Sequence, residues 1–390
     1  MPITPTALPA TRKPPLPALT GIRTLLAINI VLFHFTPPHL GVLYHVVDSG
    51  YVFVGVFFLI SGYILTYNYS DRAATLNKRS FWLARFSRLY PVYLLALVLS
   101  FKMLEDEWHV RSHAEFWQGV VLTPLLLQGW SPNLSTFWNT VAWTLSCEVV
   151  LYLAFPWLIR LPWPKSPGRL ILLLLTFWCI GLIPHSLYLL FDPDHLGGPV
   201  TRYSSTTLLR FLKYTPLPYV CTFLSGVTLG RLQLSLTFTQ RQRLTLAAAS
   251  LAALVLFFYA AVPRMPYLLM HGGLVIPLFA ALILGLSGPH LISSVFAWRP
   301  LLLVGESSYC LYLLHFNIFI LIHTYRLPER LHLTSIEPWF SYGVLIALSL
   351  AAFHFVEIPA RKAILARFSQ KPRAVVAPPQ PSASGSPSRA

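Results

Sequence analysis

The sequence predicts an all-α polytopic membrane protein, on two observations. Of its 390 residues, 55% are hydrophobic and only 11% are charged, and the mean hydropathy is +0.61. A soluble domain carries about 25% charged residues, so this chain has too few to cover its surface in water. The apolar residues also come in runs close to the ~20 residues that cross a bilayer. Disordered, collagen-like and secreted disulfide-rich classes are therefore excluded.

Ten of these runs are long enough to span a membrane. They cover about residues 19–37, 51–69, 87–104, 138–159, 170–191, 214–230, 244–262, 268–287, 301–323 and 338–356. An eleventh run, residues 117–128, is short, and such a segment is tolerated at membrane depth only where protein buries it or it lines a cavity. We therefore predict about ten transmembrane helices plus one short re-entrant or interfacial helix.

The basic residues predict the orientation of the chain. If the short run turns back without crossing, 21 of the 29 Lys and Arg residues fall in loops on the side of the two termini. Loops rich in Lys and Arg stay in the cytoplasm, so we expect both termini there. The net charge of +16 is then a sign of orientation beside membrane lipid, and we expect no nucleic-acid partner.

Three parts follow from this reading. Residues 1–18 are expected to be a cytoplasmic N-terminal segment, residues 19–362 the membrane domain, and residues 363–390 a basic, Pro/Ser-rich, disordered cytoplasmic tail. The four cysteines lie in apolar runs without a Cys-x-x-Cys spacing. They are expected to be packing residues, and the sequence indicates no metal site.

Ionisable side chains within spans are costly, so each one is a functional candidate. Arg23 and His34 lie eleven residues apart in the first run, which is about three helical turns and ~16 Å along one face. Such a helix can hold an anion near the cytoplasmic mouth and carry an acid/base group further along. The alternative is an Arg23 that reaches the lipid headgroups and a His34 bonded to a neighbouring helix.

Two arginines accompany the third run. Arg85 and Arg88, in the segment RFSRLYP at the end of a cytoplasmic loop, share a helical face and can bind a polyanionic ligand together. They can equally be anchors that contact lipid phosphate. Their spacing fits both roles.

The fifth run carries Ser146 and Glu148 in an apolar stretch. A carboxylate there must be paired, protonated or facing a wet cavity, and its expected partner is His34 or an arginine. The two side chains are about 200° apart on a regular helix, so they cannot both face one site unless the helix is distorted. Glu148 is therefore the stronger functional candidate.

Three further runs carry polar patterns. In the tenth run, Tyr309, Tyr312 and His315 are expected to form one polar stripe, either as part of a site or as hydrogen bonds between helices. In the second run, FFLISGY (57–63) offers small residues where another backbone can approach closely. At the end of the last run, Glu357 and Arg361 are spaced to form an ion pair.

Taken in chain order, these segments resemble the membrane-bound acyltransferase-3 family, of the carbohydrate O-acetylase type. Six motifs carry the resemblance: Arg23, ten residues, then His34; FFLISGY; Arg85 and Arg88 as Arg-x-x-Arg; WTLSCE from Trp143 to Glu148; SYCLYLLH from Ser308 to His315; and Glu357, Pro359 and Arg361 as E-x-P-x-R. Together they cover about residues 19–362.

The resemblance implies a ten-span enzyme, an acyltransferase that transfers groups other than amino-acyl groups. It implies His34 as the catalytic residue and Glu148 as a functionally important acid. It also implies that Arg23, Arg85 and Arg88 bind an acyl-CoA donor from the cytoplasmic side. The expected location is a bacterial inner (plasma) membrane.

The leading hypothesis is transfer of an acyl group, expected to be acetyl, from acyl-CoA to a hydroxyl of a carbohydrate, lipid-linked sugar or glycosylated small molecule. His34 would act as general base on that hydroxyl, directly or through an acyl-histidine intermediate. Glu148 would orient His34 or stabilise its charged form, and a hydroxyl such as that of Tyr309 would stabilise the oxyanion. The residues expected to bind substrate or support the site are Ser146, Tyr309, Tyr312 and His315.

The alternative is a transporter or flippase of a lipid-linked glycan that has no acyl-transfer activity. Such a protein would also have many spans and buried Arg, His and Glu side chains. Many transporters are built from two repeated halves, which show in their hydropathy. No repeat of this kind is found in this sequence, which favours the enzyme.

Overall fold

The computed structural model describes residues 13–368, and this part of the chain consists of helices and connecting loops without a β-strand. Its α-helices are α1 (Pro17–His34), α2 (Tyr44–Asp48), α3 (Val52–Tyr69), α4 (Lys78–Leu99), α5 (Phe101–Val110), α6 (His113–Leu122), α7 (Trp143–Leu158), α8 (Pro167–Phe191), α9 (Thr207–Tyr214), α10 (Pro216–Ser235), α11 (Gln240–Leu256), α12 (Tyr267–His271), α13 (Ile276–Leu286), α14 (Leu291–Phe296), α15 (Arg299–Glu306), α16 (Ser308–Thr324), α17 (Leu327–Arg330), α18 (Trp339–Ala352) and α19 (Ile358–Phe368). Short 3₁₀ turns are η1 (Gly41–Leu43), η2 (Ser70–Arg72), η3 (Gln128–Trp130), η4 (Pro132–Leu134), η6 (Val262–Arg264) and η7 (Thr334–Ile336), and η5 (Phe257–Ala261) and η8 (Phe353–Glu357) are π turns.

Seven helical segments within residues 13–368 are long and apolar enough to cross a membrane, and α15 with α16 forms an eighth that is bent by 67°. All ten predicted runs lie on helices, but α7 has only 16 residues and α10 does not meet the same criterion. The fold therefore supports seven to eight spans by length and composition, and the count of ten stays a prediction. The short run falls on α6, which ends at Leu122 and is not among the spans.

The outer helices expose apolar side chains. On α8, Leu172 and Leu190 are 65% and 74% exposed, and on α11, Val255 and Leu256 are 68% and 65% exposed. Soluble monomers rarely present large apolar patches to water. These surfaces are suited to lipid, in agreement with a polytopic membrane protein.

The centre of the bundle is the contact between α3 and α10. A Cβ atom on Gly62 would lie 2.3 Å from the carbonyl oxygen of Phe223, and one on Gly226 would lie 2.1 Å from that of Leu59. Only glycine permits two helices to approach this closely, and in lipid such van der Waals packing is a main source of helix association. The close approach predicted at FFLISGY is thus confirmed for Gly62.

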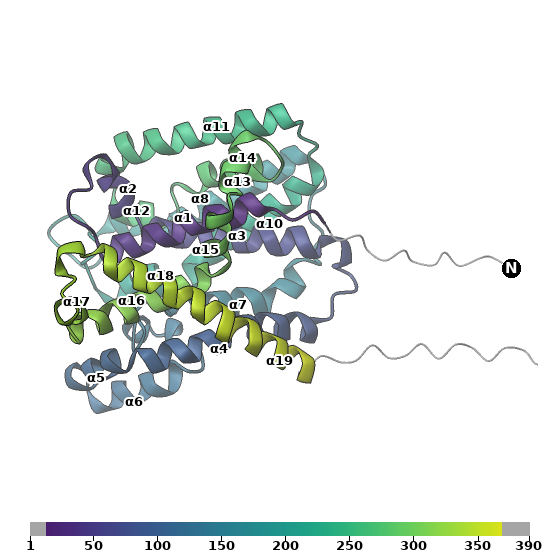
Figure 1. Ribbon diagram of the computed structural model, residues 1–390. Coiled ribbons are helices and arrows are strands. Elements are labelled where there is room, and N and C mark those ends of the chain that lie inside the picture. The colour runs from purple at the N-terminus through teal and green to yellow at the C-terminus, as the bar shows by residue number, and fades with distance from the viewer. Residues whose placement is uncertain (1–12, 369–390) are drawn as a thin grey trace, which may run out of the picture.

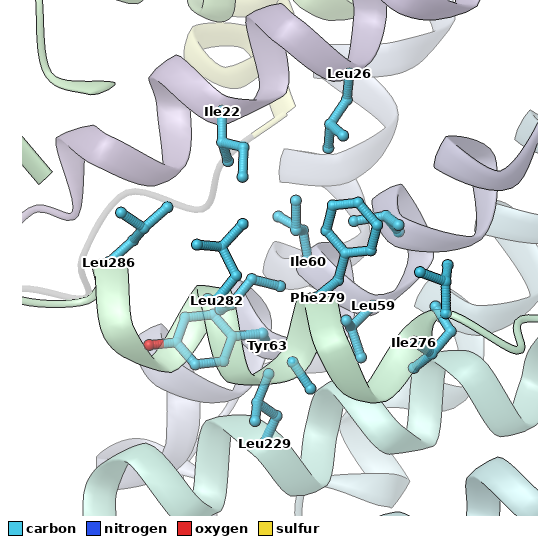
Figure 2. Close-up of a cluster of buried hydrophobic side chains, with 14 of the residues drawn as sticks. Ile22, Leu26, Leu59, Ile60, Tyr63, Leu229, Ile276, Phe279, Leu282 and Leu286 are labelled. Atoms are coloured by element: carbon cyan, nitrogen blue, oxygen red, sulfur yellow. The ribbon is translucent and has the colours of Figure 1, made fainter. Parts of the chain in front are cut away.

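Helix α3 is also enclosed by α1 and α13. Figure 2 shows Ile22 and Leu26 of α1 directed toward Ile60 of α3 and toward Phe279 and Leu282 of α13. All five side chains are buried in one hydrophobic cluster. This packing fixes α1, the helix that carries Arg23 and His34, against the centre of the bundle.

The helix bundle has two ends, and the termini of the described chain lie at one of them (Figure 1). Helix α1 begins, and α19 ends, at one end of the bundle, whereas α2, α12 and α17 lie at the opposite end (Figure 1). The assignment of the first end to the cytoplasm rests on the Lys and Arg count. Of the predicted tail, 363–368 belong to helix α19, and 369–390, like 1–12, lie outside the described residues.

Candidate active site

A cavity of about 700 Å³ lies among α1, α3, α4, α7 and α16. Its rim includes Lys13 ahead of α1 and Asn68 in the last turn of α3, so it lies toward the end of the bundle where α1 begins. Its deeper lining includes Tyr312 of α16. Volumes of this size are typical of sites for small molecules and cofactors.

Three arginines from two helices line this cavity. Arg23 comes from α1, and Arg85 and Arg88 come from α4. The sequence placed the latter two at the end of a loop, but α4 already begins at Lys78, where the side chain of Asn77 accepts a hydrogen bond from the Ser80 N–H (3.0 Å) and caps the helix. Both arginines therefore project from a helix, which holds them more rigidly than a loop.

The lining of the cavity is strongly cationic. Four basic side chains, those of Lys13, Arg23, Arg85 and Arg88, face one acidic side chain, that of Glu148, among the lining residues. Of the four, Lys13 lies 3.0 Å from a carboxylate oxygen of Asp71. Within residues 13–368, Arg23 and Arg85 form no ion pair, and the buried Nε of Arg85 has no hydrogen-bond partner. Partly buried guanidinium groups are costly without a partner, so the cavity is suited to an anionic ligand.

Glu357 holds the third arginine. Its Oε1 lies 3.7 Å from the Nε of Arg88, and its Oε2 accepts a hydrogen bond from the Cys310 thiol (3.4 Å). The prediction that Glu357 pairs with Arg361 is therefore wrong, because its ion-pair partner among the described residues is Arg88. Glu357 is the last residue of the π turn η8. A π turn contains more residues than a turn of α-helix, so the side chains at its end point in a different direction from those of a regular helix. Glu357 is buried as a result, beside α4.

Glu148 lies among the arginines and not beside His34. The Tyr152 hydroxyl donates a hydrogen bond to its Oε1 (3.0 Å), and Ser61 in turn donates to the Tyr152 oxygen (2.8 Å). His34 follows Arg23 by eleven residues, or ~16 Å along α1. The expectation that Glu148 orients His34 is therefore not met by the geometry.

Ser146 points away from the cavity. It is fully buried, and its Oγ accepts a hydrogen bond from the backbone N–H of Gly129 (3.3 Å). Ser146 thus supports the turn η3 that follows α6. The prediction that Ser146 and Glu148 face different surroundings is confirmed.

The two tyrosines of the predicted stripe bind backbone carbonyls. The hydroxyl of Tyr309 donates to the carbonyl of Leu89 (2.7 Å), and that of Tyr312 donates to the carbonyl of Val141 (3.2 Å). These bonds tie α16 to α4 and to the start of α7. Because the Tyr309 proton is already used, this hydroxyl is not free to stabilise an oxyanion, contrary to the expectation from the sequence.

His34 and His315 form a pair at the other end of α1. His34 is the last residue of α1 and is partly exposed, whereas His315 is fully buried in α16. Their ring centroids are 5.2 Å apart and the rings are tilted by 40°. The ring of Tyr312, which lines the cavity, lies 5.9 Å from that of His315. The cavity thus reaches to within one side chain of the histidine pair.

A loop covers the neighbourhood of His34 from the side of α2. The guanidinium of Arg202 lies 5.1 Å from the centre of the Phe33 ring and 3.7 Å from a carboxylate oxygen of Asp48. Phe33 in turn contacts the His34 ring edge-on, with centroids 5.1 Å apart. Arg202, which reaches the neighbourhood of His34 through Phe33, was not singled out from the sequence.

Lys213 holds this loop in place. Its buried ammonium group donates hydrogen bonds to the backbone carbonyls of Ser204 (2.8 Å) and Arg202 (3.4 Å). Burial, with a further contribution from the charge of Arg210, lowers the pKa of Lys213 to about 8. Lys213 therefore anchors the loop through backbone carbonyls, and it forms no ion pair within the described part of the chain.

A family model described as an acyltransferase domain, Acyl_transf_3, matches residues 16–354. The chain belongs to the acyltransferase-3 family. The match includes all the cavity arginines and both members of the histidine pair, and it ends three residues before Glu357. Within residues 13–368, no cluster of three or more potential metal ligands is found.

The chain is similar to proteins of Streptomyces, Staphylococcus and Listeria. The chain is 33% identical to acyltransferase MdmB of Streptomyces mycarofaciens over 177 residues, which cover 42% of this chain and 43% of that protein. It is 23% identical to O-acetyltransferase OatA of Staphylococcus aureus over 394 residues, with 92% and 59% covered, and 23% identical to peptidoglycan O-acetyltransferase OatA of Listeria monocytogenes over 379 residues, with 89% and 56% covered. The chain thus spans 43% to 59% of the length of these relatives. No solved structure matches.

Two residues that line the cavity, Ser61 and Tyr152, were not singled out from the sequence as site residues. Tyr152 follows Glu148 by four residues, a spacing that places both on one helix face and could have indicated the contact. Ser61 lies within FFLISGY, but only the packing of α3 against α7 shows that it contacts Tyr152. Arg88 and Glu357 are far apart in the chain, so no pattern in the sequence near either residue predicts that they pair.

Proposed function

We propose that the protein is an integral-membrane O-acyltransferase that moves an acyl group, acetyl as the expected one, from acyl-CoA to a hydroxyl of a carbohydrate or glycosylated acceptor. One observation carries this proposal: a cationic cavity enters from one end of the bundle and extends to the neighbourhood of a partly exposed histidine at the other end of α1. The names of the OatA relatives support O-acetyl transfer and, in one case, a peptidoglycan acceptor.

The cavity suits the donor. Coenzyme A carries several phosphate charges and a long apolar arm that ends in the thioester. Guanidinium groups bind phosphate with two parallel hydrogen bonds, and neither Arg23 nor Arg85 forms an ion pair within residues 13–368. In the proposed pose the phosphates contact the arginines, and the thioester extends toward Tyr312 and the histidine pair.

The histidine suits the chemistry. A ring nitrogen of His34 removes the proton of the acceptor hydroxyl while the hydroxyl oxygen attacks the thioester carbonyl carbon. The carbon–sulfur bond breaks, an ester forms, and CoA leaves as a thiol after taking up the proton. An acyl-histidine route has the same overall balance. Glu148 is held by the hydrogen bond from Tyr152, and its negative charge offsets part of the positive charge of the arginines. It takes no part in the chemical step.

The orientation completes the proposal. If the end where α1 begins is cytoplasmic, the cavity opens to the compartment that supplies acyl-CoA in a bacterial cell. His34, near α2 and the Arg202 loop, then faces the outside and its acceptors.

Thiol release by the purified protein in lipid nanodiscs tests the function. With acetyl-CoA and a set of acceptors, namely peptidoglycan fragments, free disaccharides and glycosylated small molecules, we expect acceptor-dependent release of CoA thiol and a matching gain of one acetyl group by mass spectrometry. A transporter or flippase would move a lipid-linked glycan without releasing thiol, and that result would overturn the proposal.

The donor site is tested by calorimetric titration with CoA. Arg85→Ala and Arg88→Ala are expected to weaken CoA binding by about 10-fold or more, since a hydrogen bond to a charged group contributes roughly 1.5–3 kcal/mol. Arg169→Ala is the matched control, because Arg169 is exposed at the start of α8 and lies outside the cavity. Equal affinity in all variants would instead identify Arg85 and Arg88 as lipid anchors.

A further inference from the structure

The hydrogen bonds of His315 identify its tautomer. Its Nδ1 lies 2.5 Å from the backbone carbonyl oxygen of Tyr312. A carbonyl only accepts hydrogen bonds, so Nδ1 carries the proton, and the other nitrogen of the neutral ring, Nε2, bears a lone pair. This Nε2 is buried and has no hydrogen-bond partner within residues 13–368. A buried polar atom without a partner is rare and calls for an explanation.

Among the rings around His315, His34 is the one that can supply a proton. Phe35 and Phe316 pack against His315 with centroids 6.2 Å away in each case, and neither carries a polar hydrogen. The Tyr312 hydroxyl is directed to the carbonyl of Val141. The centroid of the His34 ring, 5.2 Å from that of His315, is the nearest of the four.

We propose that His315 is the positioning and proton-accepting partner of His34, so that the site works as a histidine pair and not as a His34–Glu148 pair. This inference rests on the proposed acyl transfer. In the chemical step one nitrogen of His34 acts on substrate. As one nitrogen of His34 takes the hydroxyl proton, the proton on its other nitrogen passes to Nε2 of His315. When the carbon–sulfur bond breaks, His34 gives the hydroxyl proton to the departing CoA thiolate, and the proton on Nε2 of His315 returns to His34, so both rings end in their starting tautomers. No net charge is created, and no further reactant is needed.

The surroundings explain why a second imidazole is useful here. Phe33, Phe35 and Phe316 pack around the partly exposed ring of His34, so they limit the directions from which water can reach it. The bond from Nδ1 to the Tyr312 carbonyl fixes the His315 ring, so its orientation costs little entropy during the reaction. Tyr312 then connects the pair to the cavity that holds the donor.

Two substitutions separate proton acceptance from hydrogen bonding. His315→Asn can keep the donor to the Tyr312 carbonyl, and His315→Gln can place an amide oxygen near the Nε2 position, but neither side chain takes up a proton. His323→Gln is the matched control, since His323 lies on the same helix, is exposed and stacks on Phe319 instead.

The measurements are kcat, KM for acetyl-CoA, CoA affinity and thermal unfolding in nanodiscs. We expect both His315 variants to lose about 100-fold or more in kcat, within the range of general acid–base catalysis, with KM and CoA affinity unchanged and His323→Gln at the wild-type rate. Added imidazole is expected to restore part of the rate of His315→Ala, which a purely structural defect would not allow.

Two outcomes would overturn the histidine pair. One is a His315→Gln protein that retains the wild-type kcat while His34→Ala is inactive. The other is a parallel loss of kcat, CoA affinity and melting temperature in all His315 variants without rescue by imidazole, which would assign His315 to packing. Either result leaves the proposed function standing if the wild-type protein releases thiol, whereas a wild-type protein that releases none overturns both.

Discussion

The two ends of α1 present different chemistry. Arg23, near the start of the helix, faces a cavity with further arginines and one carboxylate, whereas His34, at its end, is surrounded by aromatic rings and a second histidine. The first end is suited to binding a charged ligand, and the second to transferring a proton between two imidazole rings. A single helix thus separates the cationic cavity from the histidine pair by ~16 Å.

This contrast makes the loss of the histidine the largest expected effect. His34→Ala is expected to lower kcat by about 100- to 10,000-fold, the range of general acid–base catalysis, because it removes the proposed general base. CoA affinity is expected to stay at the wild-type value, since His34 does not line the cavity. Thiol-release kinetics and calorimetry on the same preparation check both statements. A His34→Ala protein with weakened CoA binding and normal kcat would reverse the contrast.

The opposite pattern is expected at the start of α1. Arg23→Ala removes a guanidinium that has no ion-pair partner in the described residues. The substitution is therefore expected to weaken binding of the anionic donor and not to break a contact within the protein. We expect a rise in KM for acetyl-CoA of about 10- to 100-fold, from roughly 1.5–3 kcal/mol for a charged hydrogen bond, and a smaller change in kcat. Steady-state kinetics over a range of donor concentrations measure it. An unchanged KM would mean that Arg23 contacts lipid headgroups instead.

Glu357 offers a smaller and more selective test. Glu357→Gln keeps the size of the side chain but removes the charge beside Arg88, so the guanidinium is less firmly oriented. A several-fold rise in KM for the donor is expected at constant kcat, from about 1 kcal/mol. Arg361→Ala is the control for the partner that the sequence indicated. If Arg361→Ala gave the larger effect, the ion pair described above would not control the donor site.

The smallest expected effect concerns the acceptor side. Arg202→Ala removes the guanidinium over Phe33 and frees Asp48. We expect KM for the acceptor to change by a few-fold, because an exposed ion pair contributes at most about 1 kcal/mol, and KM for acetyl-CoA to stay constant. Kinetics with the acceptor varied at saturating donor provide the measurement. A change confined to donor KM would contradict the division between the two ends.

Much of the fold and part of the site could be read from the sequence. The lengths of the apolar runs place every predicted span on a helix, and the helical period puts Arg23 and His34 on one helix at a known separation. It also separates Ser146 from Glu148 correctly. Hydropathy does not locate the start of α4, which begins nine residues before the predicted run. Charged residues at the start of this helix lower the local hydropathy without ending the helix.

Which side chains the polar residues contact could not be predicted from hydropathy and helical period. The spacing of Glu357 predicts Arg361 as its partner, and the structure shows Arg88 instead. For Glu148 the sequence leaves His34 or an arginine open, and the structure places it in the cavity with the arginines. In the structure the π turn η8 directs Glu357 to Arg88, and the tilt of α16 after its bend brings His315 to His34. Neither the π turn nor the 67° bend has a clear signal in the sequence.

The sequence by itself determined the fold class, the family and the ionisable residues that a membrane span would otherwise exclude, because hydropathy and helical period are local properties of the chain. Tertiary structure alone decided which of these residues meet. Cavities, ion pairs and the histidine pair form between helices that are distant in the chain, and their contacts depend on how closely the backbones pack, as at Gly62 and Gly226. Packing therefore turns a list of polar residues into two separate sites on one helix.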